Sequence, residues 1–158
     1  NDEKIAALMD WTGDSYKSIN GYLFGGRNPS KDVIHQVECI DEAISDHITR
    51  ERFTVDRQMR LSTFHVNDME SLFDLNTGRT FEHIGYMATS IKGGGIDVDG
   101  EDRIATRILV PPGSAGVYVE PITQHPGEYE ILLPRGRALR FEGLGASDGR
   151  PIVYLRLL

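Results

Sequence analysis

The spacing of the apolar residues changes near residue 50, and this change limits the folds that the chain can adopt. Before it, aliphatic side chains recur every three or four positions, at Val33, Val37, Ile40, Ile44 and Ile48. This period predicts a helix over residues 32–48 with one buried face, capped by Ser30 or Asp32. After residue 50, short runs alternate between apolar and polar residues, which is typical of strands.

Helices followed by strands indicate an α+β fold with largely antiparallel sheets. Residues 3–24 predict two helical pieces with a break at residues 12–15, and residues 68–75 predict a short helix that buries Met69, Leu72 and Phe73. Strands are expected at residues 53–59, 85–91, 103–110, 116–122, 138–141 and 151–158, with a glycine-rich loop over residues 143–149. We expect a single domain over residues 1–158, mainly helical at 1–50 and mainly strands at 51–158.

Charge and cysteine content limit the partners and the compartment. The 24 acidic residues exceed the 17 Lys plus Arg residues, and a formal charge of -7 argues against nucleic acid as a partner. Cys39 is the single cysteine, so an internal disulfide is excluded, and a reducing compartment fits. It lies beside an apolar stripe and predicts a small buried hydrophobe rather than a nucleophile.

The ends and the hydropathy of the chain carry two further expectations. No apolar run approaches the roughly 18 residues of a membrane-spanning helix, so we expect no membrane partner. The chain begins with Asn1 rather than Met, which suggests a processed product or an excised domain of a longer protein.

Two carboxylates stand two residues apart in the stretch from 127 to 136, which predicts a turn followed by a short strand. On a strand, Glu128 and Glu130 would lie on the same face. Such a pair is either a solvated strand face or a site in which one acid stabilises a developing cation while the other handles a proton. His125, just before the pair, is more typical of a turn than of a catalytic base.

Two other groups of polar residues admit alternatives. Arg57 lies in line with the apolar residues of its expected strand, either as a snorkelling arginine or as a guanidinium held to bind an anion. Asp97, Asp99 and Asp102 follow three glycines, but their spacing departs from the EF-hand pattern. We therefore expect a solvated acidic loop there and no metal site.

Three features follow one another along the chain, namely Arg57, Ala88-Thr89-Ser90 and Glu128-Tyr129-Glu130. This order resembles the Arg, Ser-Thr-Ser, Glu-x-Glu signature of the mono-ADP-ribosyltransferases of bacterial toxins and phages. The stretches 53–57, 85–90 and 127–136 are also similar to the family's motifs, and residues 16–20 resemble a helix that precedes its core. The resemblance implies N-terminal helices packed on a mostly antiparallel two-sheet β core.

The resemblance implies an enzyme that moves ADP-ribose from NAD, its substrate, to an acceptor side chain. Glu130 would stabilise the sugar cation, Ser90 would orient Glu130, and Glu128 would act on the acceptor. The NAD-binding residues would be Arg57 on the pyrophosphate, Thr89 at the nicotinamide, and their neighbours Ala88 and Gln58.

The sequence departs from the family pattern at three places. Ala88 replaces the first Ser, and Asp56 stands where an aromatic residue usually precedes the arginine, so Arg60 remains an alternative to Arg57. The glycine-rich loop after Ser90 replaces a helix that carries the nicotinamide-stacking aromatic, so the resemblance assigns no residue to that task.

In this family a Glu at the position of Glu128 is associated with arginine acceptors, so the resemblance implies protein arginine as the partner. The enzyme would act in the cytoplasm of a target cell, secreted or injected as part of a larger protein. An NAD glycohydrolase on the same scaffold and a non-catalytic binding domain of a larger toxin or phage protein remain alternatives.

Overall fold

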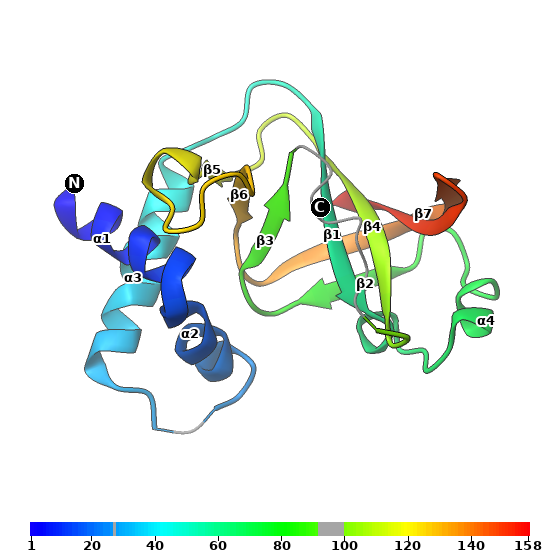
Figure 1. The fold of residues 1–158 in the computed structure, drawn as a ribbon, viewed down its shortest axis with the longest axis horizontal. Coiled ribbons are helices and arrows are strands. Elements are labelled where there is room, and N and C mark those ends of the chain that lie inside the picture. The colour runs from blue at the N-terminus through cyan, green and yellow to red at the C-terminus, as the bar shows by residue number, and fades with distance from the viewer. Residues whose placement is uncertain (27, 92–99) are drawn as a thin grey trace.

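The computed structural model describes residues 1–26, 28–91 and 100–158. The helices α1 (Asp2–Asp10), α2 (Tyr16–Leu23) and α3 (Lys31–Ser45) form a layer at one end of the molecule, and the strands form the rest (Figure 1). Ser30 caps α3 by accepting a hydrogen bond from the Val33 N–H, as predicted. The helix ends before Ile48, which instead forms a bridge with Ala115 and is 56% exposed.

The predicted break between the first two helices is confirmed. The chain continues from α1 into a π-helical turn over Trp11–Ser15, in which Gly13 leaves the helical region with φ −85° and ψ −119°. This turn buries Trp11 and Thr12. The Thr12 hydroxyl donates to the Met9 carbonyl, and Trp11 packs against Tyr86.

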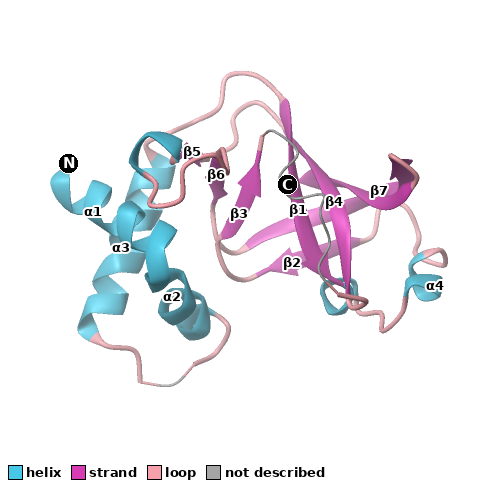
Figure 2. Ribbon diagram, in the orientation of Figure 1, coloured by secondary structure: helices cyan, strands magenta, loops and turns pink. Residues whose placement is uncertain are grey.

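The strands of the described residues form one eight-stranded sheet in the order β2-β7-β8-β4-β1-β3-β6-β5. Figure 2 shows the strands in magenta beside the cyan helical layer. They are β1 (Phe53–Arg60), β2 (Thr80–His83), β3 (Met87–Ser90), β4 (Arg103–Val110), β5 (Val117–Tyr118), β6 (Glu130–Leu133), β7 (Arg137–Ser147) and β8 (Arg150–Leu157). All neighbours are antiparallel except β4 and β8.

The expectation of two sheets is therefore wrong, and the seam between β1 and β3 explains why. These strands pair through a single register position, Asp56 opposite Ser90. This one pair makes the hydrogen bonding continuous, although β3, β6 and β5 splay away from β1. Ser90, one of the predicted catalytic residues, thus lies at this seam.

Two apolar cores lie on either side of the splayed strands. One is built mainly from β1, β4, β7 and β8, and the other from the helices together with β5 and β6. Alternate residues of β6 enter different cores, with Leu133 in the first and Leu132 in the second. Because both its faces are covered, β6 is held rigidly between the helices and the rest of the sheet.

Several predicted strands have different bounds. β5 stops at Tyr118, and a 3-10 turn over Glu120–Ile122 replaces the rest of the predicted strand, because Pro121 has no N–H for a ladder. The predicted glycine-rich loop is wrong, since β7 and β8 form a hairpin whose turn is Asp148-Gly149. Both residues have positive φ, 50° and 75°, the signature of an Asp-Gly hairpin turn.

Four smaller points also need correction or comment. Strand β2 was not predicted, and Phe73 is 69% exposed beyond the short helix α4 (Met69–Leu72), whereas Leu72 is buried. Asp97 and Asp99 of the predicted acidic loop lie outside the described residues. None of the described helices is both long and apolar enough to span a bilayer.

Candidate active site

Three cavities adjoin along the seam, and Arg57 lines all of them. The aromatic cavity, of about 410 Å³, lies between the π-helical turn, α2 and β3 and contains Trp11, Tyr16 and Tyr86. The junction cavity, of about 490 Å³, is lined by β1, β3 and the turn before β6. The outer cavity, of about 570 Å³, extends past Gln58 and Arg60 toward Phe24 and His83. Together they form one cleft.

Glu130 is the first residue of β6 and borders both the aromatic and the junction cavities. It is 9% exposed, and its Oε2 atom is buried without a hydrogen-bond partner. Burial, followed by repulsion from Glu128, raises the pKa of Glu130 to about 7, while Trp11 and the charge of Arg57 act in the opposite direction. A carboxylate that titrates near neutral pH in a cleft is typical of a functional group.

Arg57 reaches the cleft from β1. Its Nη1 donates a hydrogen bond to the Ala88 carbonyl at 2.8 Å, which fixes the guanidinium against β3. The residue is partly exposed, but its Nε is enclosed and has no partner. Burial lowers the pKa of Arg57, and attraction to Glu130 opposes this effect. Because an arginine remains charged in proteins, Arg57 supplies a fixed cation beside the carboxylate.

Three polar side-chain atoms in the described part of the chain are buried without a partner, namely Asn20 Oδ1, Arg57 Nε and Glu130 Oε2. The three residues come from α2, β1 and β6, and all of them line the aromatic cavity. An unpaired buried polar atom costs about 1–3 kcal/mol. The aromatic cavity thus has an amide, a guanidinium and a carboxylate among its lining residues, a set that suits a polar ligand.

The middle motif lies on β3, between Arg57 and Glu130. Ser90 is buried opposite Glu130 in the ladder, so the two side chains leave the sheet on the same face. The Thr89 hydroxyl donates to the Ile131 carbonyl at 2.7 Å and thereby ties β3 to β6. Ala88 borders the aromatic and junction cavities, and Gln58 borders the junction and outer cavities.

Asp56, which stands where an aromatic residue was expected, has a structural partner. Arg107 holds its carboxylate through two hydrogen bonds, from Nε at 2.8 Å and from Nη2 at 3.2 Å. The pair spans β1 and β4, opposite each other in register. This pair keeps the buried Asp56 charge compensated next to the seam.

Glu128 does not lie on the strand, and this corrects the predicted alternation. Tyr129 has φ 50°, so the chain turns between Glu128 and β6. Glu128 is exposed, yet it lines the same two cavities as Glu130. The two carboxylates face one cleft from a turn and a strand end, which allows them different environments.

The turn before Glu128 is held by side chains. Glu120 accepts hydrogen bonds from the backbone N–H groups of Gly127, at 2.6 Å, and Tyr129, at 3.0 Å. The Gln124 side chain donates to the Met9 carbonyl at 2.9 Å, and its backbone N–H donates to the Thr12 hydroxyl at 3.0 Å. The segment that carries Glu128 is thus fastened to the helical layer.

The model of the family described as ADP-ribosyltransferase exoenzyme matches residues 1–151. The chain belongs to this family. Mono-ADP-ribosyltransferase C3 from Clostridium botulinum C phage is 39% identical over 75 residues, which is 47% of this chain. That match spans only 30% of the length of the C3 protein.

Solved structures of other ADP-ribosyltransferases share the fold. Plx2a, a toxin from Paenibacillus larvae, has a TM-score of 0.82 at 23% identity, over 100% of this chain and 87% of its own. C3stau2 from S. aureus, solved with NAD, has a TM-score of 0.76 at 20% identity, and the match covers 100% of this chain and 87% of C3stau2. Vis, solved in complex with agmatine, has a TM-score of 0.69 at 14% identity, and the match covers 100% of this chain and 75% of Vis.

Within the exoenzyme cleft, sequence reasoning missed residues that come from distant elements. Trp11 packs edge-on against Tyr86 at 5.4 Å and against Tyr16 at 6.2 Å, and the three rings border the aromatic cavity. Arg103 lies opposite Arg60 in register and lines the junction and outer cavities. The similarity of residues 16–20 to a helix of the family was the one signal in the sequence that pointed to the wall of the aromatic cavity.

The histidines and the cysteine have separate environments. His125 lies in the turn and also borders the aromatic cavity. His83 donates from Nδ1 to the Gly85 carbonyl at 2.8 Å, and burial, with a smaller effect from Arg57, lowers its pKa to about 4, so it is neutral at pH 7. Cys39 is buried away from the cleft, and burial raises the pKa of its thiol.

Proposed function

We propose that this exoenzyme transfers ADP-ribose from NAD to the guanidinium group of a protein arginine and releases nicotinamide. The observation that carries the proposal is that Asn20, Arg57 and Glu130 line one cavity together with three aromatic residues. Their amide, guanidinium and carboxylate groups suit a ligand with polar groups on a sugar and a carboxamide. Of the three rings, Tyr16 is exposed and suits contact with a planar heterocycle, whereas Trp11 and Tyr86 are buried.

Glu130 would act on the bond that breaks. When the bond between C1′ of the ribose and the nicotinamide nitrogen breaks, its electron pair leaves with nicotinamide and positive charge develops on the sugar. An ionised Glu130 in a partly buried site stabilises this charge more than it would in water. Ser90, opposite it on β3, would hold the orientation of the carboxylate.

The phosphates of NAD would lie along the arginines of the cleft. Arg57 lines all three cavities, and Arg103 lines the junction and outer cavities with Gln58. Arg60 is exposed and reaches only the outer cavity, so we assign the pyrophosphate to Arg57 rather than to Arg60. The NAD-bound structure of the similar C3stau2 supports NAD as the ligand.

Glu128 would act on the acceptor guanidinium. An exposed carboxylate at the mouth of the cleft can orient a guanidinium and accept the proton that its nitrogen loses as the new bond to C1′ forms. The structure of Vis with agmatine, a guanidinium compound, supports this class of acceptor. The acceptor protein would be met in the cytoplasm of a target cell, where NAD is available.

The test compares two variants with labelled NAD, with and without agmatine. Glu130→Ala should lose both nicotinamide release and labelling of agmatine by at least a hundredfold, because the charge that stabilises the cation is gone. Glu128→Ala should lose labelling of agmatine but retain nicotinamide release into water. Glu70→Ala, an exposed glutamate on α4, is the matched control and should keep both activities.

The same assay separates the competing functions. Release of nicotinamide without labelling of agmatine or of any protein acceptor would identify an NAD glycohydrolase. A chain that neither cleaves NAD nor binds it in calorimetry would be a non-catalytic binding domain, and the proposal would be withdrawn. Transfer that survives unchanged in Glu128→Ala would remove Glu128 from the acceptor side.

A further inference from the structure

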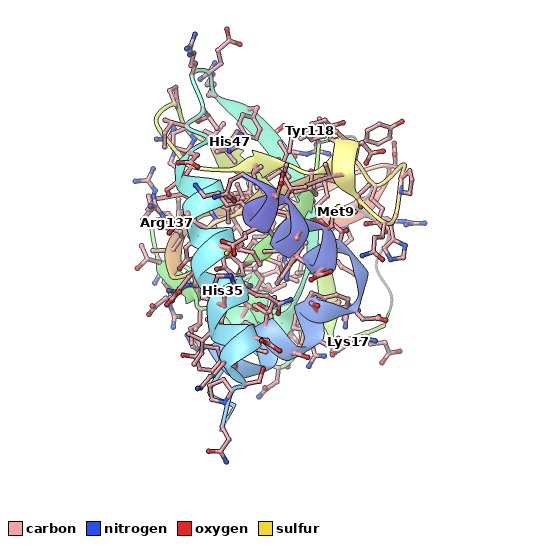
Figure 3. The ribbon with its side chains drawn as sticks, turned by 90° about the vertical axis from the view of Figure 1, so that its left-hand side faces the viewer. Met9, Lys17, His35, His47, Tyr118 and Arg137 are labelled. Atoms are coloured by element: carbon pink, nitrogen blue, oxygen red, sulfur yellow. The ribbon has the colours of Figure 1, made fainter. Side chains whose placement is uncertain are left out.

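A second group of titratable side chains lies on the helical layer, away from the cleft. Among the described residues, Glu3, His35 and Cys39 each offer one ligand atom, and these atoms all lie within 4.8 Å of one another. His35 and Cys39 are four residues apart on α3, so they share a face of that helix. Glu3 comes from α1, which runs beside α3 (Figure 3).

The distances within this trio resemble those between the ligands of a tetrahedral zinc ion. The His35 Nε2 atom lies 3.6 Å from Cys39 Sγ and 3.8 Å from Glu3 Oε1. Zinc bonds of about 2.0 Å to nitrogen and 2.3 Å to sulfur, at a tetrahedral angle, separate the two ligand atoms by about 3.5 Å. The His35–Cys39 separation thus already suits zinc, and the exposed Glu3 side chain needs only a small movement.

The surrounding charge also favours a cation. Carboxylates of Glu3, Glu38 and Glu42 act on the Cys39 sulfur, against a single ammonium group, that of Lys4. Lys4 is itself paired with Asp46 at 2.7 Å and with Glu42 at 3.5 Å. A thiolate, an imidazole and a carboxylate form a donor set that suits Zn²⁺ better than the hard ions Mg²⁺ or Ca²⁺.

We propose that Glu3, His35 and Cys39 bind one zinc ion that links α1 to α3, with solvent in the fourth position. The Cys39 thiol would release its proton to bulk water on binding, and no electron transfer is involved. α1 leads directly into Trp11, which borders the cleft, so the ion would stabilise the wall that carries this ring. The proposal does not depend on the reaction assigned to the cleft.

Zinc titration of the full chain, freed of metal with a chelator, tests this site by calorimetry. Wild-type protein should bind one Zn²⁺ per chain and unfold at a higher temperature with zinc than without it. His35→Gln should weaken the affinity at least tenfold. His47→Gln is the matched control, since His47 is exposed just beyond α3 and outside the trio, and it should bind zinc as the wild type does.

Cobalt gives a second, spectroscopic test. Co²⁺ in the site should give a thiolate-to-cobalt charge-transfer band in the near ultraviolet, and Cys39→Ser should abolish it. Because Cys39 is buried and its serine variant can misfold, Glu3→Gln, an exposed change, should weaken Zn²⁺ binding on its own. Equal Zn²⁺ affinity in wild type and His35→Gln, or a cobalt complex without the thiolate band, would overturn the proposal.

Discussion

The carboxylate of Glu120 holds the backbone of Tyr129 in place, accepting its N–H at 3.0 Å. The other carboxylate oxygen accepts the N–H of Gly127 at 2.6 Å. The two hydrogen bonds flank Glu128, whose own side chain is exposed. Tyr129 has φ 50°, a conformation that a tyrosine rarely adopts unless its surroundings impose it. Glu120 therefore determines where Glu128 stands relative to the cleft.

Glu120→Ala should reduce transfer to agmatine about tenfold or more, while nicotinamide release without acceptor changes less than about threefold. The loss of one hydrogen bond to a charged group is worth about 1.5–3 kcal/mol, and tenfold corresponds to about 1.4 kcal/mol. The turn would relax and Glu128 would lose its position, whereas Glu130 stays in β6. Steady-state assays of both reactions measure the two effects.

The control for this substitution is Glu70→Ala on α4, which should leave the ratio of the two reactions unchanged. Equal losses of transfer and hydrolysis in Glu120→Ala would contradict a role confined to the acceptor side. They would indicate that the turn supports the whole cleft.

NAD cleavage should depend on pH through the ionisation of Glu130. The pKa of Glu130 is raised to about 7, and only its ionised form stabilises the sugar cation. Activity should therefore fall about tenfold per pH unit below 7 and reach a plateau above it. Profiles of kcat/KM for nicotinamide release between pH 5 and 9 measure this limb.

Glu128→Gln should shift the acidic limb of that profile to lower pH, because repulsion from Glu128 is a cause of the raised pKa of Glu130. The midpoint in the variant should remain above the ordinary value for a glutamate, since burial is the larger cause. A midpoint that is the same in both proteins would contradict the coupling of the two carboxylates.

Local patterns carried enough information for the order of elements and for the three motifs. The helical period of Val37, Ile40 and Ile44 predicted α3, and all three side chains are buried. Period alone could not predict that Pro121 ends β5 or that Asp148-Gly149 joins β7 and β8 in a hairpin. The Asp-Gly pair was a readable signal for that hairpin, but the many neighbouring glycines favoured a loop.

The candidate site was only partly readable, because its wall is formed by tertiary contacts. Glu130, Arg57 and Ser90 could be chosen from their motifs. Trp11 meets Tyr86 across 75 residues of sequence, and no short pattern records such a contact. Asn20 of α2 and Arg103 of β4 line the cleft for the same reason, since only the folded chain brings them beside the motifs.

Glu130→Gln should be more stable than the wild type above pH 7. The pKa of Glu130 in the folded chain, about 7, exceeds its ordinary value of 4.5, so the folded state holds the proton more tightly than the unfolded state. The contribution of this carboxyl to stability is therefore lost as pH rises from 4.5 to 7. The variant avoids that loss and should gain up to about 3 kcal/mol at pH 8.

Urea unfolding of both proteins at pH 4.5 and at pH 8 measures the difference in the free energy of unfolding. The gain of Glu130→Gln should nearly vanish at pH 4.5, where the wild-type carboxyl is protonated in the folded state. A variant that is less stable than the wild type at pH 8 would mean that the charge of Glu130 is stabilised by Arg57 more than it is destabilised by burial.

Gly85, just before β3, lies close to Asn20 of α2, and replacing it should affect both stability and the cleft. A Cβ at this position would lie 2.7 Å from Asn20 Oδ1 and 2.8 Å from the Phe24 ring. Gly85→Ala should therefore cost about 1 kcal/mol of unfolding free energy, the lower end for overpacking, because both contacts are with side chains that can shift. It should also weaken NAD binding, because Asn20 and Phe24 both line cavities of the cleft.

Gly21→Ala is the matched substitution, since Gly21 lies within α2 and a Cβ there meets nothing within 4 Å. Alanine in a helix interior should stabilise the protein by about 0.5–1 kcal/mol and leave NAD affinity unchanged. Urea unfolding and calorimetric titration with NAD measure both variants. If Gly85→Ala matched Gly21→Ala in both measurements, the close approach of Asn20 to Gly85 would not shape the cleft. A loss of NAD affinity in Gly85→Ala, with unchanged affinity in Gly21→Ala, would tie the position of Asn20 to ligand binding.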